Sequence, residues 1–109
     1  MNLIEIAKNY FAEFSKKNLN SLSDMFTDDV ILIDWEINQS GKNNVLNANK
    51  KIFDSVDTIS VKPLILAQND NTVFAELLIK VNDTITLKVV DVITFNPEGN
   101  IEKIVAYKR

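Results

Sequence analysis

The segment from Thr84 to Asn96 constrains the fold of this chain more than any other part of it. It reads TITLKVVDVITFN, and side chains along a strand point alternately to two faces. One face is apolar except for Asp91, which lies at its middle between Val89 and Ile93. A long strand with one apolar face predicts a sheet that is covered on that side by other elements.

Asp91 is the unusual residue of this strand, because a buried carboxylate is costly unless it is paired, hydrogen-bonded or protonated. One interpretation is a structural Asp that bonds to a neighbouring hydroxyl or amide. The other is a functional carboxyl with a raised pKa, because such groups often belong to sites. We expect burial to keep Asp91 largely protonated near neutral pH. A second carboxylate, Asp34, falls in another apolar strand pattern. It is either a second functional carboxylate or an Asp at the end of a strand that turns toward solvent.

The residue types that are missing narrow the chemistry. The chain has no His and no Cys, and its one Arg is the last residue, Arg109. These absences exclude the usual zinc sites, thiol nucleophiles and His-based triads, and they argue against an Arg clamp for phosphate. Acid–base chemistry is left to Asp, Glu, Tyr and Lys, and we predict no metal and no cofactor.

Charge and hydropathy indicate the compartment and exclude some partners. The net charge of −3 is spread over mixed signs, which argues against nucleic acid as a partner. No segment resembles a signal peptide or a membrane-spanning helix, so neither export nor a membrane partner is expected. We therefore expect a cytoplasmic protein.

The periodicity of apolar residues predicts an α+β fold in one domain, residues 1–109, with the helices early and a run of hairpins late. The helices should cover one face of a single sheet. A turn is expected at residues 38–42. The predicted helices are 3–17, 19–26 and 43–56, and the predicted strands are 30–37, 58–68, 72–81, 84–96 and 101–108.

Two stretches in this order resemble a known family. The helical hairpin YFAEFSKKNLNSLSDMFTDDV and the late VVDVITFNPEGNIEKIVAY are similar to the SnoaL-like branch of the NTF2-like superfamily, which includes ketosteroid isomerase. The resemblance implies an NTF2-like (cystatin-like) cone, in which three helices pack in a strongly curved, mostly antiparallel sheet with a pocket at the open end. Members of the superfamily are commonly dimers.

The resemblance to ketosteroid isomerase also implies roles for three residues. Tyr10 falls on the Tyr of the oxyanion hole, Asp34 on the general base and Asp91 on the protonated Asp of the oxyanion hole. Two positions depart from that enzyme: Trp35 replaces a proline, and Asn49 falls on a supporting tyrosine. The residues expected to line a ligand pocket are Phe14, Phe26, Trp35, Phe53, Ile93, Ile104 and Ala106.

Two function classes follow from this reading. The first is a cofactor-free isomerase or polyketide cyclase that acts on a small, largely apolar carbonyl compound, with Asp34 as base and Tyr10 and Asp91 as hydrogen-bond donors. The second is a non-catalytic ligand-binding or dimerisation module in which Asp91 is structural. A homodimer through the outer face of the sheet is expected in either case, because Val90 and Val92 leave an apolar patch there.

Overall fold

The computed structural model describes the whole chain, Met1 to Arg109, and contains three helices and one six-stranded sheet. None of the helices is long and apolar enough to span a membrane. The helices are α1 (Leu3–Ser15), α2 (Leu19–Met25) and α3 (Lys42–Ser55). The strands are β1 (Phe26–Ile33), β2 (Asn38–Ser40), β3 (Ile59–Asn69), β4 (Thr72–Val81), β5 (Ile85–Phe95) and β6 (Ile101–Lys108).

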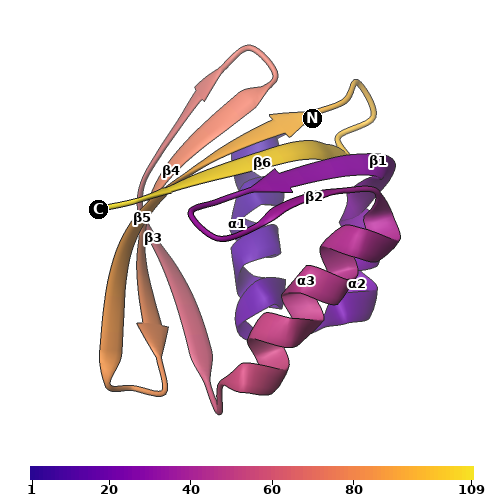
Figure 1. Cartoon of the computed structure of the whole chain (residues 1–109). Coiled ribbons are helices and arrows are strands. Elements are labelled where there is room, and N and C mark those ends of the chain that lie inside the picture. The colour runs from indigo at the N-terminus through magenta and orange to yellow at the C-terminus, as the bar shows by residue number, and fades with distance from the viewer.

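The sheet bends strongly around the helices, which all lie on one side of it (Figure 1). Its strand order is β2-β1-β6-β5-β4-β3, and every pair is antiparallel except β1 with β6. Because β1 pairs with β6, the first and the last strands of the chain lie side by side in the sheet. This architecture confirms the predicted α+β cone.

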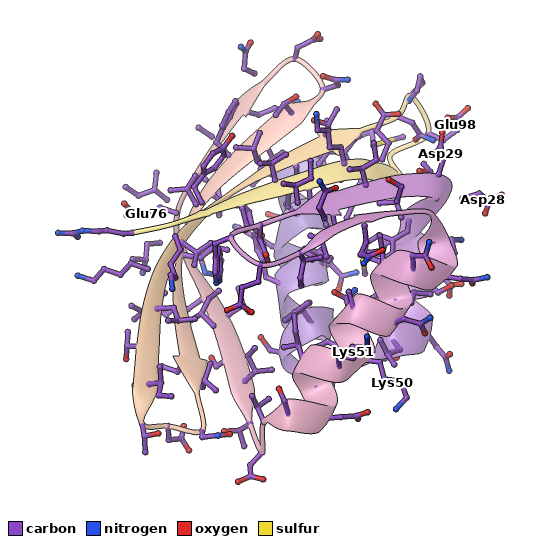
Figure 2. All side chains as sticks on the ribbon, viewed as in Figure 1. Asp28, Asp29, Lys50, Lys51, Glu76 and Glu98 are labelled. Atoms are coloured by element: carbon purple, nitrogen blue, oxygen red, sulfur yellow. The ribbon has the colours of Figure 1, made fainter.

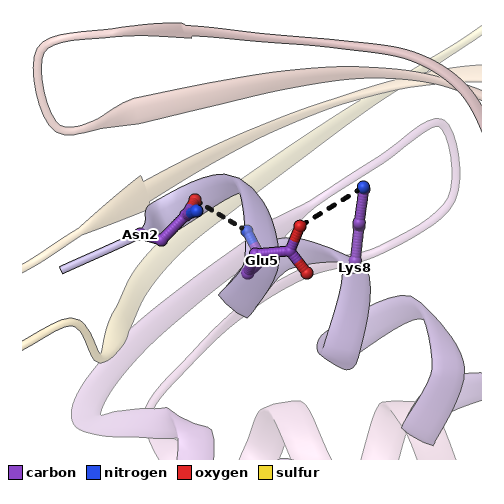
Figure 3. A network of polar contacts seen from close by, with 3 residues as sticks. All are labelled: Asn2, Glu5 and Lys8. Carbon is purple, nitrogen blue, oxygen red and sulfur yellow. Dashed lines mark hydrogen bonds and ion pairs between the residues drawn. The ribbon is translucent and has the colours of Figure 1, made fainter.

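A hydrogen bond to the first turn fixes the start of α1. The Asn2 side chain accepts a hydrogen bond from the Glu5 backbone N–H at 3.2 Å, and the Lys8 ammonium lies 3.4 Å from the Glu5 carboxylate (Figure 3). Such an N-cap satisfies one of the N–H groups that a helix start leaves without a partner. From this start, the buried residues Ala7, Tyr10 and Phe11 face the sheet.

The alternation predicted along β5 is confirmed. Val89, Asp91, Ile93 and Phe95 are buried, and the residues between them face outward or are only partly covered. The same alternation holds along β4, where residues directly opposite each other on paired strands share a face. The inner faces of β4 and β5 therefore form one apolar wall, with Asp91 as its single carboxylate.

The strand after α2 was predicted at the wrong place. It begins at Phe26 and not at Val30, and it ends at Ile33 and not at Ile37. The Asp34 backbone N–H donates to the Ile37 carbonyl at 2.8 Å, which closes a turn and lets residues 38–40 return as β2. The predicted turn at residues 38–42 is thus mostly a short strand.

One face of the helix α3 packs against the sheet, and the opposite face is exposed to solvent. Val45, Asn49 and Phe53 are buried at a spacing of four residues. Lys50 and Lys51 are exposed on the outer side of α3 (Figure 2), and Lys50 pairs with Asp54 at 2.6 Å. The buried face of α3 therefore contains one amide, Asn49.

Candidate functional site

A cavity of about 300 Å³ lies between the helices and the inner face of the sheet. Residues from α1, α3 and all strands except β2 line it, together with the turn after β1. Of the 21 lining residues, 17 are hydrophobic, so a ligand that fills the cavity must be largely apolar. This volume is at the lower end for small-molecule sites, which suits a compound of one or two rings.

Asp91 lies in the wall of this cavity and is 8% exposed. Its neighbours across the strands are Ala75 on β4 and Ala106 on β6, whose small side chains leave room for the carboxyl group. Burial, and to a smaller extent the negative charge of Asp34, raise the pKa of Asp91 from its ordinary value to about 7. Much of the Asp91 population is therefore protonated near neutral pH and able to donate a hydrogen bond.

Tyr10 reaches the same cavity from α1 and is 5% exposed. Its ring packs against Phe11, Phe14 and Phe26, with centroids 5.5, 6.0 and 6.2 Å away. Burial raises the pKa of the Tyr10 hydroxyl well above its usual value, and the nearby charge of Asp91 adds to this. The hydroxyl thus stays protonated and is a hydrogen-bond donor at every physiological pH.

Asp34 lines the cavity directly after β1 and is half-buried. Its Oδ1 accepts hydrogen bonds from the backbone N–H groups of Glu36 at 2.7 Å and Ile37 at 2.6 Å. These two bonds form the turn that ends β1, and they hold the carboxylate in place. Because both bonds go to Oδ1, the other carboxylate oxygen is the one left for a proton or a ligand.

Tyr10, Asp34 and Asp91 thus line one cavity, although they come from three separate parts of the chain. The pocket residues predicted from the sequence divide into two groups. Phe14, Trp35, Ile104 and Ala106 line the cavity. Phe26, Phe53 and Ile93 do not line it but are buried in the core.

Packing explains where two of the predicted pocket aromatics lie. Phe53 contacts Phe14 edge to face, with centroids 4.8 Å apart, and of these two rings only Phe14 lines the cavity. Trp35 belongs to the turn after β1, where it is 42% exposed and the Lys108 ammonium lies 5.3 Å from its ring centre. Trp35 therefore lines the cavity from the turn and not from a strand.

The sequence reading missed several lining residues. Leu77, Ile79, Leu87 and Val89 lie on the inner faces of β4 and β5, so the alternation that predicted these faces was the signal that could have found them. Asn49 was noted only as a departure from the isomerase pattern. Its place on the buried face of α3 makes it a lining residue.

Comparisons with known proteins agree with this fold. The model of the SnoaL-like domain family matches residues 7–106. A candidate SnoaL-like polyketide cyclase from Shewanella denitrificans superposes with a TM-score of 0.88 at 11% identity, over 98% of this chain and 90% of that one. A candidate ketosteroid isomerase from Kribbella flavida gives a TM-score of 0.84 at 13% identity, over 96% and 76%.

An NTF2-like protein of unknown function from Cytophaga hutchinsonii is similar as well, with a TM-score of 0.84 at 10% identity, over 100% of this chain and 91% of that one. Identities this low show a shared fold and nothing of shared chemistry. No curated protein matches the sequence.

Proposed function

The chain belongs to the SnoaL-like domain family, and we propose that its cavity binds a small, largely apolar carbonyl compound and moves a proton next to the carbonyl group. The observation that carries this proposal is the meeting of Tyr10, Asp34 and Asp91 in one apolar cavity.

In this mechanism Asp34 is the general base. Its carboxylate takes a proton from the carbon next to the carbonyl, the C–H electron pair moves into the carbon skeleton, and the carbonyl oxygen becomes an enolate. The Tyr10 hydroxyl and the protonated Asp91 donate hydrogen bonds to that oxygen, on which negative charge develops. Asp34 then returns the proton to carbon, and no cofactor takes part.

Ligand binding without turnover is the second candidate function. The hydrogen bonds from Glu36 and Ile37 to Asp34 favour it, because they give this carboxylate a structural task in the turn. Under this alternative the cavity and the two donors Tyr10 and Asp91 still bind an oxygenated apolar ligand, but Asp34 removes no proton.

A proton-exchange experiment separates the two candidates. The protein is mixed with 2-tetralone in D₂O, and NMR follows the loss of the protons next to the carbonyl. Catalysis predicts exchange above the buffer rate that is lost in Asp34→Asn, a variant that keeps a side-chain oxygen for the turn. Binding of 2-naphthol, an aromatic mimic of the enolate, with no exchange above background supports the second function. If the protein shows neither binding of 2-naphthol nor exchange above background, both candidate functions are contradicted.

We further propose a homodimer through the outer face of the sheet. Val90 on β5 lies opposite Tyr107 on β6 and Glu76 on β4, and Val90 and Tyr107 are exposed there. Glu76 points away from the helices on this face (Figure 2). An exposed apolar patch on a sheet supports a contact between two copies that bury it symmetrically.

A further inference from the structure

Asn49 is a buried polar residue that the proposed mechanism does not use. It lies on α3 and is 2% exposed, and its Nδ2 is buried with no hydrogen-bond partner. The same helix points Lys50 and Lys51 to solvent (Figure 2), so Asn49 occupies the inner side. A buried amide N–H₂ without an acceptor is costly, and natural proteins keep few of them.

The surroundings of Asn49 indicate what could satisfy it. Among the buried residues that line the cavity, the polar side chains are Tyr10, Asn49 and Asp91 alone. Further along α3, Ile52 and then Val56 just after the helix line the same cavity and are more exposed than Asn49, so the amide belongs to its covered part. The acceptor that Asn49 lacks within the protein can therefore be supplied by a molecule in the cavity.

The Asn49 amide does not duplicate the other two donors. Tyr10 and Asp91 line the cavity from α1 and β5, and the proposed mechanism assigns both of them to one ligand oxygen. Asn49 reaches the cavity from a different wall, α3. Rotation about its last side-chain torsion has a broad, roughly twofold profile, so the amide can turn its N–H₂ toward a ligand at little cost.

We propose that Asn49 is a ligand-binding residue that donates a hydrogen bond to a second oxygen of the ligand. The inference rests on the proposed function and specifies its substrate class: a small apolar frame with two oxygen functions, one for Tyr10 and Asp91 and one for Asn49. A site with such a donor discriminates against a ligand that has a methylene group in place of the oxygen, because the donor is then left without a partner.

Matched naphthols test this inference. The probes are 6- and 7-methoxy-2-naphthol and their 6- and 7-ethyl counterparts. Each ethyl compound has a methylene group of similar size in place of the ether oxygen. The 6- and 7-positions place that oxygen in two different directions from the phenol group. The wild-type protein should bind at least one methoxy compound about five- to tenfold more tightly than its ethyl partner. Asn49→Leu, which replaces the amide with an apolar side chain of similar volume, should remove that preference.

A direct measurement accompanies the affinities. The side-chain N–H₂ resonances of Asn49, assigned in the wild-type protein through their connection to the Asn49 backbone, should move downfield when the preferred methoxy compound binds and stay in place with its ethyl partner. This wild-type measurement is informative even if Asn49→Leu folds poorly.

The outcomes separate this inference from the function on which it rests. If the naphthols bind and Tyr10→Phe weakens them, but no methoxy preference depends on Asn49, only the role of Asn49 is overturned. The same holds if its N–H₂ resonances do not move with any probe. If no naphthol binds, the proposed function and this inference fail together.

Discussion

The role of the Tyr10 hydroxyl group can be tested separately from that of its ring, because Phe has the same ring without the hydroxyl. Tyr10→Phe keeps the packing against Phe11 and Phe26, so we expect the free energy of unfolding to change by no more than about 1 kcal/mol. If the hydroxyl is a donor to the ligand, the affinity for 2-naphthol should fall about five- to tenfold. Titration calorimetry measures this, with Tyr107→Phe on the outer face as the control. Equal affinities in Tyr10→Phe and wild type would contradict the donor role.

The carboxyl of Asp91 makes the stability of the protein depend on pH. Its pKa is about 7 in the folded protein, against an ordinary value of 3.8, so the native state holds an extra proton between these values. The contribution of Asp91 is therefore fully present below about pH 4 and is lost as pH rises to about 7, above which it levels off. The full difference corresponds to about 4 kcal/mol.

Asp91→Asn tests this dependence, because the amide keeps the shape of the side chain and cannot ionise. We expect the variant to gain stability relative to wild type as pH rises from about 4 to 7, by up to about 4 kcal/mol, with no further gain at higher pH. Urea unfolding at several pH values measures the difference, and Asp29→Asn at an exposed position is the control. A difference that does not change with pH would mean that Asp91 titrates near its ordinary value.

At the scale of elements, the turn after β1 combines a structural and a proposed chemical role in Asp34. Asp34→Ala removes the acceptor for the Glu36 and Ile37 N–H groups and should destabilise the protein by about 1–3 kcal/mol. Asp34→Asn keeps an acceptor oxygen and should cost less, while it abolishes proton exchange with 2-tetralone. Thermal unfolding and the exchange assay measure the two effects. Exchange that persists in Asp34→Asn would exclude Asp34 as the base.

At the scale of the whole molecule, the outer face of the sheet predicts the oligomeric state. Two copies of a 12.4 kDa chain should give a mass of about 25 kDa by light scattering at micromolar concentration. Val90→Glu places a second carboxylate beside Glu76 and should yield monomers, because like charges would face each other across the symmetric contact. Lys50→Glu on the outer side of α3 is the control and should stay dimeric. A monomeric wild-type protein would refute the predicted dimer.

The sequence by itself determined those helices and strands whose apolar residues recur with a regular period. The alternation along β4 and β5 and the helical spacing of α1 are local periodicities, which follow from the geometry of each element, so they predicted these elements and the inward position of Asp91. The order of elements was enough to predict an α+β domain, and the resemblance to the SnoaL-like family implied its cone shape. The proposed roles of Tyr10, Asp34 and Asp91 remain predictions.

Only the tertiary structure decided how the separate elements meet. The apolar alternation continues through Trp35 and Ile37, so nothing in the pattern marked the end of β1 at Ile33, which results from the backbone hydrogen bonds around Asp34. Phe53 packs against Phe14 of another helix and does not line the cavity, and no local pattern distinguishes these two rings. The polar Asn49 is buried because α3 packs against β1 and α2. Such burial depends on contacts between residues far apart in the chain, which no local period records.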